Sequence, residues 1–220
     1  MTDFAAARRM MVDGQVRPSD ITDPRIIAAM FELPRERFVS ERRAGIAYLD
    51  LDVPVGDGED SRRMLKPMVL AKLIQAAEIS GSDRVLDVGC ASGYSTALLA
   101  QLAGSVVGVE EDPALVRQAE AALAEAGLVN AKVLQGPLAT GAASEGPYDV
   151  IVMQGATEIV PVALFDQLHD GGRLVCVFGR SQAGKGMIYR LIEGEFSGRP
   201  LFDAAAPLLP GFAQRPEFVF

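Results

Sequence analysis

A short glycine turn and three acidic side chains are the residues whose types and spacing suggest chemistry. The stretch VLDVGCASGYSTALLA holds Asp87 two residues before Gly89, and the acidic pair Glu110 and Glu111 begins 21 residues after that glycine. A glycine turn lets the backbone approach a ligand closely because no Cβ stands in the way. Carboxylates accept hydrogen bonds and attract cations. The spacing therefore predicts a site for a small ligand that carries donors or positive charge.

The turn departs from the dinucleotide-binding fingerprint, which would place glycines at positions 89, 91 and 94. Here Ala91 and Tyr94 take the second and third positions, and a tyrosine ring would crowd a pyrophosphate at the helix start. Glu110 is placed to accept both hydroxyls of a ribose, and Asp87 would attract a cationic amino group. These residues predict S-adenosylmethionine as cofactor, with S-adenosylhomocysteine as its product, and disfavour a nucleotide-linked oxidoreductase.

The predicted cofactor site combines the glycine turn, the acids and two residues after the next strand. Its members are Asp87, Gly89, Cys90, Ala91, Ser92, Gly93, Tyr94, Glu110, Glu111, Gln135 and Gly136. The alternative interpretation is that these are ordinary turn residues of an α/β protein. Cys90 is expected to be a small packed residue, since no histidine lies near it in the sequence to activate a nucleophile. No metal site is predicted, because one histidine and two distant cysteines make no usual ligand cluster.

The overall composition limits the classes of partner. The net charge of −8 repels phosphate backbones, so we expect no nucleic-acid partner. Residues 88–109 form an uncharged run of 22 residues, but its glycines and serines indicate buried α/β core rather than a membrane span. The N-terminus lacks a long apolar core and is not expected to be a secretory signal. Together with sparse cysteine, these features predict a cytoplasmic protein, and we expect it to be a monomer.

Alternating apolar strands and amphipathic helices must position these residues. From residue 84 onward we predict strands 85–88, 105–109, 131–134, 148–155, 171–179 and 186–195, with helices 93–102, 113–126 and 162–168. Uniformly apolar strands separated by helices predict a mostly parallel sheet covered on both faces, and the last two strands predict an antiparallel edge. Further helices are expected within 23–38 and from Pro67 until Gly81.

Four stretches resemble the protein-L-isoaspartate O-methyltransferase family. VLDVGCASGYSTALLA is similar to its nucleotide-binding motif, in which a tyrosine follows the last glycine. The N-terminal MVDGQVRPSDITDPRIIAAMFELPRERFV, the central VVGVEEDPALVRQAEAAL and the later YDVIVMQGATEIVPVALFDQLHDGGRLVCVFG resemble further parts of the family. The likeness covers most of the chain and is weakest over the last residues. It implies a Rossmann-like class I methyltransferase fold with an N-terminal helical extension, residues 1–66, and a cofactor-binding domain, residues 67–220.

The resemblance also implies a reaction. Family members methylate the carboxylate of an abnormal aspartyl residue in a peptide or protein, as part of the repair of damaged proteins. Gly89, Ala91, Gly93 and Tyr94 would then cradle the methionine end of the cofactor, and Glu110 would hold the ribose. An ionised carboxylate needs no base to attack a sulfonium, so orientation and exclusion of water carry the catalysis.

Two departures from the family pattern concern the substrate and the adenine. Leu65 stands where the family has a serine whose hydroxyl helps to hold the substrate carboxylate, and Pro137 stands where an aspartate accepts from adenine. Gln135 is one substitute for that acceptor. Candidate substitutes for the serine are Arg62, Arg63 and Ser61. The alternative interpretation, which runs of charge usually favour, is that these arginines are solvated loop charges that pair with Asp57, Glu59 and Asp60. The alternative functions are a regulatory cofactor-binding module or a methyltransferase with another carboxylate substrate.

Overall fold

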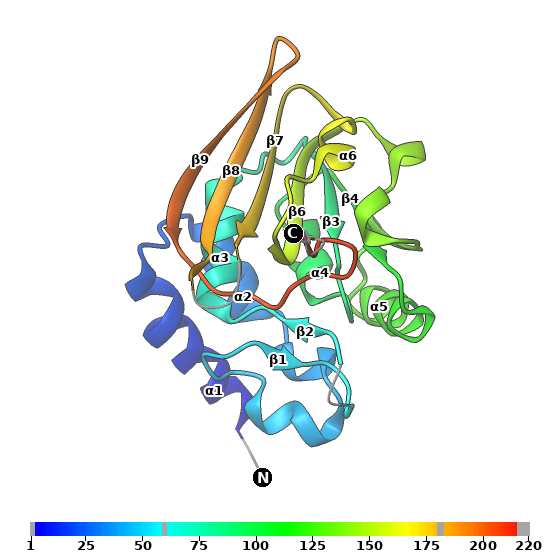
Figure 1. The fold of residues 1–220 in the computed structure, drawn as a ribbon. Helices are drawn as coiled ribbons and strands as arrows, with labels where there is room; N and C mark the ends of the chain where they lie inside the picture. Colours follow the sequence, from blue (N-terminus) through cyan, green and yellow to red (C-terminus); the bar gives the residue numbers. More distant parts are fainter. Residues whose placement is uncertain (1–2, 59–60, 180–182, 215–220) are drawn as a thin grey trace, which may run out of the picture.

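A seven-stranded sheet forms the centre of the computed structural model, which describes residues 3–58, 61–179 and 183–214 (Figure 1). The strands are β3 (Arg84–Val88), β4 (Ser105–Glu110), β5 (Ala131–Gln135), β6 (Tyr148–Thr157), β7 (Leu168–Phe178), β8 (Lys185–Ile192) and β9 (Glu195–Asp203). Their order is β5-β4-β3-β6-β7-β8-β9, and the first five in that order run parallel. The predicted mostly parallel sheet is therefore confirmed.

The strand order reverses between β3 and β6, because the chain leaves β3 for β4 on one side and returns to β6 on the other. In open parallel sheets, ligands bind beyond the carboxyl ends of strands at such a reversal. The glycine turn follows β3 directly, and Gln154 and Gly155 lie near the end of β6. The topology thus brings the sequence-predicted turn to the position where a ligand is expected.

Side-chain alternation along the strands divides the core between two faces. One hydrophobic cluster contains Val85 of β3 together with α3 (Pro67–Ala76), α4 (Tyr94–Ala100), α5 (Pro113–Glu125) and the N-terminal helices. The other contains Leu86 and Val88 together with α6 (Val162–Phe165), the 3₁₀ helix η5 (Leu138–Thr140) and the C-terminal segment. Asp87 alternates with Leu86 and Val88, so it lies on the face that α4 covers.

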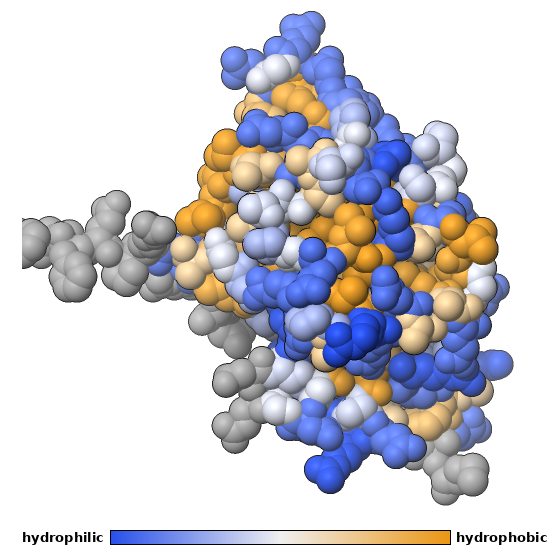
Figure 2. Space-filling view, turned by 90° about the vertical axis from the view of Figure 1, so that its right-hand side faces the viewer, coloured by the Kyte–Doolittle hydropathy of each residue, from blue (hydrophilic) through white to orange (hydrophobic). Residues whose placement is uncertain are grey.

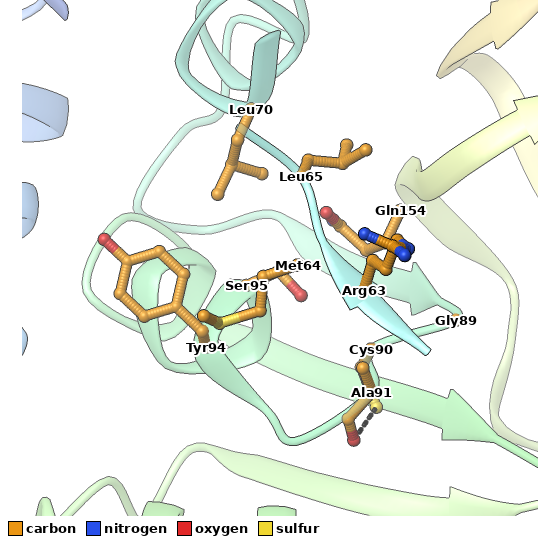
Figure 3. Close-up of a pocket in the computed structure, with 10 residues that line it drawn as sticks. All are labelled: Arg63, Met64, Leu65, Leu70, Gly89, Cys90, Ala91, Tyr94, Ser95 and Gln154. Carbon is orange, nitrogen blue, oxygen red and sulfur yellow. Dashed lines mark hydrogen bonds between the residues drawn. The ribbon is translucent and has the colours of Figure 1, made fainter. Parts of the chain in front are cut away.

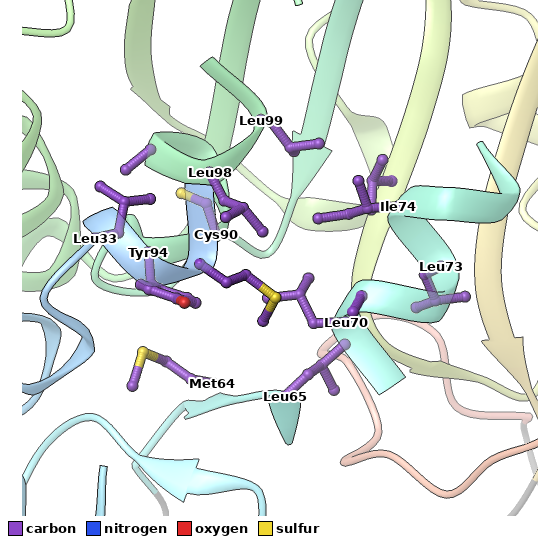
Figure 4. Packing of buried hydrophobic residues seen from close by; sticks show 14 of the residues in the cluster. Leu33, Met64, Leu65, Leu70, Leu73, Ile74, Cys90, Tyr94, Leu98 and Leu99 are labelled. Carbon is purple, nitrogen blue, oxygen red and sulfur yellow. The ribbon is translucent and has the colours of Figure 1, made fainter. Parts of the chain in front are cut away.

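The N-terminal third builds a layer across the carboxyl ends of β3 and β4 (Figure 1). It comprises α1 (Phe4–Met11), α2 (Pro24–Glu32), the helical turns η1 (Val12–Val16), η2 (Arg17–Ser19), η3 (Arg35–Phe38) and η4 (Glu41–Ile46), and the short strands β1 (Val53–Pro54) and β2 (Arg63–Met64). Asp3 and Asp23 cap α1 and α2 by accepting from backbone N–H groups. Its apolar residues pack on α3 and α4, as Figure 4 shows for Leu33, Met64 and Leu65.

The antiparallel edge is larger than the sequence predicts. β8 pairs antiparallel with β7, as predicted, and β9 then adds a further strand along β8. The pattern of β9 hides it, because Gly198 and Pro200 are typical of turns. Pro200 is tolerated here because β9 is an edge strand and its pairing is irregular opposite Gly186 and Met187.

Two predicted helix ends were wrong. The predicted helix 162–168 stops at Phe165, because Leu168 already pairs with Tyr148 as the start of β7. The helix from Pro67 stops at Ala76, and Glu78 then adopts a positive φ of 50°. In both cases the chain leaves the helix earlier than its apolar pattern indicates, because the neighbouring strand or turn recruits the next residues.

The C-terminal segment after β9 runs as extended chain over the end of β6. Ala156 N donates to Pro207 O at 2.7 Å and Leu209 N donates to Ala156 O at 2.9 Å. Leu209 and Phe212 are buried in the second core cluster. The tail therefore closes the sheet beside the glycine turn.

The surface and the lengths of the helices bear on whether the chain could cross a membrane. Figure 2 views the side of the molecule that carries α5 and shows hydrophilic and hydrophobic residues interspersed. Among the described residues, no helix combines the length and the apolar character that crossing a bilayer requires.

The domain boundary predicted between residues 66 and 67 stays a prediction. The first core cluster includes residues on both sides of it.

Candidate functional site

A small cavity of about 10 Å³, with room for about one water molecule, lies between the segment before α3 and the glycine turn. Figure 3 shows the residues that line it, which come from four places: β2 and the segment after it, α3, the turn with the start of α4, and β6. They are Arg63, Met64, Leu65, Leu70, Gly89, Cys90, Ala91, Tyr94, Ser95 and Gln154. Small-molecule sites usually enclose roughly 300–1,000 Å³, so a cofactor requires side chains at the rim to move aside.

The turn is built from three left-handed residues. Gly89, Ala91 and Gly93 have φ of 79°, 51° and 92°. Ala91 adopts this region without being glycine, a conformation that costs about 1–2 kcal/mol and is concentrated at functional sites. Ala91 therefore has the backbone conformation that a glycine would adopt, although its residue type departs from the glycine fingerprint.

Four of the five N–H groups in the turn, residues 89–93, are already used by protein acceptors. Gly89 N and Cys90 N donate to Val109 O, Gly93 N donates to Cys90 O, and Ala91 N donates to Glu110 Oε2 at 2.9 Å. A phosphate site at such a turn needs free N–H groups that converge on the anion. This turn instead ends on a carboxylate, which explains physically why a diphosphate does not suit it.

Glu110 is fully buried at the carboxyl end of β4. Its Oε1 accepts from Glu111 N at 2.9 Å and Asp112 N at 3.4 Å, and its Oε2 accepts from Ala91 N. Arg62 Nε donates to the same Oε2 at 3.3 Å, which makes an ion pair. The backbone donors fix the carboxylate beside the turn, in the position where a ribose-binding acid is expected.

Asp87 is a fully buried hub rather than an open ligand contact. Ser95 Oγ and Thr96 Oγ1 each donate to Asp87 Oδ2 at 2.7 Å, and Gln154 Nε2 donates to Oδ1 at 2.6 Å. Burial, opposed by these hydrogen bonds and reinforced by the charge of Glu110, raises the pKa of Asp87 to about 6. Asp87 therefore fixes α4 and β6 to each other and adds negative charge beneath the turn.

Gly93 allows α4 and α5 to approach closely, and alanine there is expected to reduce stability by about 2–3 kcal/mol. A Cβ on Gly93 would lie 2.9 Å from Ala119 Cβ and 3.1 Å from Ala119 Cα. The matched control is Gly127→Ala, which also has positive φ but meets nothing within 4 Å. Urea unfolding should show a clearly larger loss for Gly93→Ala; equal losses would contradict the steric explanation.

The structure gives the other turn residues packing roles. Ser92 is buried and its hydroxyl donates to Phe38 O, which ties the turn to η3. The Tyr94 ring packs edge-on against Phe38 and lies under the Arg35 guanidinium, 4.8 Å from its centre, while lining one end of the cavity. Cys90 is buried, and burial with nearby carboxylates raises the pKa of its thiol well above the usual value, which fits the predicted packing role.

The remaining predicted cofactor residues lie around Glu110. Glu111 and Gln135 are exposed, and Gln135 pairs with Glu110 across β4 and β5. Gly136 N donates to Glu110 O at 3.0 Å. Pro137 directly precedes η5 as its N-cap residue. These residues form the rim next to Glu110, and none of their side chains is committed to another partner by a hydrogen bond within the described residues.

The three candidate contacts for the substrate carboxylate lie in the segment before α3, and the structure gives each of them a different environment. Arg63 lines the cavity, with its Nη1 donating to Asp52 O at 3.0 Å. Arg62 turns to Glu110 and to Gly89 O. Ser61 Oγ accepts from Gly56 N and donates to Arg62 O, so it stabilises its own loop.

In the alternative interpretation, Arg62 and Arg63 pair with acidic residues of their own loop, and the structure describes one of these acids, Asp57. Asp57 accepts from Ser40 and forms an ion pair with Arg42, and neither Arg62 nor Arg63 reaches it. Glu59 and Asp60 lie outside the described residues.

Sequence reasoning missed several residues of the site. Gln154 lines the cavity from β6 and is held by Asp87, and its position at the end of an apolar strand was an available signal. Arg35 is fully buried and donates to Leu65 O and Ala47 O at 2.7 Å each. Arg35 thereby holds the backbone at Leu65, whose side chain is buried at the cavity. No local pattern pointed to Arg35.

The residues present fit S-adenosylmethionine. A buried acid stands at the end of β4 for the ribose, a Cβ-free cradle is formed at Gly89, and two carboxylates favour a ligand with positive charge. The cavity adjoins this cradle and is largely apolar, as a methyl-transfer site requires to exclude water. Among the described residues, no three His, Cys, Asp or Glu side chains are grouped to hold a metal ion.

Comparisons with known proteins show the family of the chain. The family model for protein-L-isoaspartate(D-aspartate) O-methyltransferase matches residues 7–198. The chain is 40% identical over 187 residues to protein-L-isoaspartate O-methyltransferase 1 of Rhodopseudomonas palustris strain HaA2, covering 85% of this chain and 75% of that one. It is 37% identical over 203 residues to the Koribacter versatilis protein-L-isoaspartate O-methyltransferase, covering 92% and 90%.

Solved structures show the same fold. One protein-L-isoaspartate O-methyltransferase superposes with a TM-score of 0.81 at 23% identity over 93% of this chain and 66% of that one. A Plasmodium falciparum structure assigned to the same activity, in complex with S-adenosyl-L-homocysteine, gives a TM-score of 0.77 at 19% identity over 95% and 99%. The Rossmann-like fold and the resemblance predicted from the sequence are both confirmed. The chain belongs to the protein-L-isoaspartate(D-aspartate) O-methyltransferase family.

Proposed function

We propose that this protein transfers a methyl group from S-adenosylmethionine to the carboxylate of an isoaspartyl residue in damaged proteins. The observation that carries the proposal is the buried carboxylate of Glu110 beside a glycine turn that opens onto an apolar cavity. That arrangement suits an adenosyl ligand on one side and a reacting carboxylate on the other.

S-adenosylmethionine supplies a methyl group on a sulfonium, which an ionised carboxylate can attack without a base. Glu110 would accept from the ribose hydroxyls, and the turn from Gly89 to Gly93 would carry the methionine end. Asp87 holds α4 and Gln154 in fixed positions and adds negative charge that favours the cationic cofactor over its neutral product. The carboxylate oxygen forms the new bond as the sulfur–methyl bond breaks, so alignment and a dry cavity supply the rate enhancement.

Arg63 is the proposed contact for the substrate carboxylate, because it is the cation of the segment before α3 that lines the cavity. Its present partner is a backbone carbonyl, Asp52 O, so the guanidinium keeps donors for a carboxylate. The side chain therefore supplies a charge-assisted contact where Leu65 offers none.

Arg63→Ala is expected to raise KM for an isoaspartyl peptide about tenfold or more while kcat changes little, since a hydrogen bond to a charged group contributes roughly 1.5–3 kcal/mol. The control is Arg42→Ala, because Arg42 is exposed and lies outside the cavity. An Arg63 variant with the KM of the Arg42 variant would contradict this role.

The presence of Leu65 supports a second candidate function, which is methylation of a different peptide carboxylate. Its side chain cannot donate to the isoaspartyl group as a serine would. Methyl transfer to an isoaspartyl peptide, measured beside the aspartyl peptide of the same sequence, tests both functions. Preference for the isoaspartyl peptide supports repair, and transfer to a terminal or aspartyl carboxylate alone supports the second function.

We further propose that the enzyme acts as a cytoplasmic monomer without nucleic acid. The net charge of −8 and two free buried cysteines support this environment. The cavity is complete within one chain, since its N-terminal and sheet residues come from the same polypeptide. Light scattering of the purified protein tests the oligomeric state directly.

A further inference from the structure

The Arg62 side chain lies across the glycine turn rather than in solvent. Its Nε donates to Glu110 Oε2 at 3.3 Å and its Nη2 donates to Gly89 O at 3.0 Å. The side chain is only 13% exposed, and Glu110 is fully buried. The guanidinium thus bridges the ribose-binding acid and the first glycine of the turn.

Glu110 has little capacity left for a ribose while this bridge is present. A carboxylate offers about four acceptor positions. Three are taken by the backbone N–H groups of Ala91, Glu111 and Asp112, which are fixed by the turn and by the chain leading into α5. The fourth partner is Arg62, and it is the partner whose bond can be released by rotating a side chain.

The bridge also occupies the open face of the turn. A Cβ built on Gly89 would lie 2.6 Å from Arg62 Nη2 and 2.9 Å from Leu209 Cδ2, so the guanidinium and Leu209 together fill the space that the missing side chain leaves. That is the space through which a ligand approaches the backbone at a glycine turn. Arg62 therefore competes with a ligand both for the acceptor and for the volume.

The Arg62 backbone stays anchored while its side chain is free to leave. Val55 N and Ser61 Oγ both donate to Arg62 O, at 2.9 and 3.2 Å. The neighbouring Arg63 belongs to β2 and lines the cavity. Rotation of the Arg62 side chain thus needs no rearrangement of the segment that carries the proposed substrate contact.

We infer that Arg62 is a latch on the cofactor site: it pairs with Glu110 until the ribose hydroxyls displace it, and it thereby sets the affinity for the cofactor. The inference rests on the proposed function, because it assumes an adenosyl ligand at Glu110. It predicts that removing the guanidinium makes adenosyl ligands bind more tightly, whereas most losses of a charged site residue weaken binding.

Calorimetric titration of the full chain with S-adenosylhomocysteine and with adenosine tests the latch. Arg62→Met keeps the apolar stem and removes the charge, and Arg42→Met is the matched control on an exposed arginine. Arg62→Met is expected to bind both ligands about tenfold more tightly than the natural protein, equivalent to about 1.4 kcal/mol. The Arg42 variant is expected to match the natural protein.

The two ligands separate the latch from another role for Arg62. Adenosine carries the ribose but no carboxylate, so an arginine that binds the methionine carboxylate would leave adenosine binding unchanged and weaken binding of S-adenosylhomocysteine. That result, or equal affinities for the Arg62 variant and the natural protein, would overturn the latch. Binding of neither ligand by either protein would refute the proposed cofactor itself, which is a different failure.

A double-mutant cycle locates the partner of the latch. With Glu110→Gln as background the ion pair is absent and only the competition for space remains, so adding Arg62→Met should tighten binding by much less than tenfold. A tenfold gain that persists in this background would show that Arg62 does not act through Glu110 and would overturn the inference. Thermal unfolding of each variant confirms that the affinities compare folded proteins.

Discussion

Replacing Asp87 by alanine is expected to lower the free energy of unfolding by about 4 kcal/mol, because it leaves several buried donors without an acceptor. Ser95, Thr96 and Gln154 all donate to this carboxylate and are all buried. For a chain of this length the loss corresponds to a fall in Tm of roughly 8–16 °C. Urea unfolding with a second probe for tertiary structure measures it, and a loss below 1 kcal/mol would contradict the hub.

Asp87→Asn is the matched control, because it keeps the shape of the side chain. Its carbonyl can accept from Ser95 and Thr96, and the Gln154 amide can turn to accept from the new NH₂ group. We therefore expect a much smaller loss of stability than for alanine. A loss as large as that of Asp87→Ala would mean that the negative charge, rather than the hydrogen bonds, holds α4 and β6 together.

The natural protein and Asp87→Asn are expected to differ in how their stability depends on pH. The pKa of Asp87 is raised to about 6 from the usual 3.8, so between these values the folded protein holds a proton that the unfolded chain releases. Stability from this group is present at low pH and is lost as the pH rises through 6. The natural protein should gain about 1 kcal/mol relative to Asp87→Asn between pH 7 and pH 5, and an unchanged difference would refute the shift.

Replacing Glu110 by alanine is expected to weaken binding of S-adenosylhomocysteine at least tenfold, because a hydrogen bond from a ribose hydroxyl to a charged carboxylate contributes roughly 1.5–3 kcal/mol. Glu110 is fully buried, and its position is fixed by the backbone N–H groups of Ala91 in the turn and of Glu111 after β4. Calorimetric titration measures the affinity, and Glu120→Ala on the exposed face of α5 is the control. An affinity within threefold of the natural protein would show that the ribose lies elsewhere.

The sequence predicts the parts of the fold that depend on local pattern. Apolar strands separated by helices indicated the parallel sheet, and the spacing from Gly89 to Glu110 located two groups that the structure joins through Ala91 N. Contacts between distant segments leave no such local signal. Arg62 meets Glu110 across 48 positions, and Leu209 of the tail packs at the glycine turn.

Leu65 departs from the pattern that the family resemblance implies, but its packing shows that the backbone there is well held. Its side chain is buried, and its carbonyl accepts from the buried Arg35. The backbone before α3 is therefore held by Arg35 and by Asp52, whose carboxylate accepts from Lys66 N at 2.9 Å. The lost hydroxyl removes one contact but leaves the segment in place, and the adjacent Arg63 faces the cavity.

Methyl transfer to an isoaspartyl peptide is the measurement that tests the central claim most directly. The natural protein is incubated with radiolabelled S-adenosylmethionine and an isoaspartyl peptide, beside the aspartyl peptide of identical sequence and beside Glu110→Ala. We predict a base-labile methyl ester on the isoaspartyl peptide, little label on the aspartyl peptide, and strongly reduced transfer by the variant. Absence of transfer to the isoaspartyl peptide, by a protein that binds S-adenosylhomocysteine, would contradict the claim.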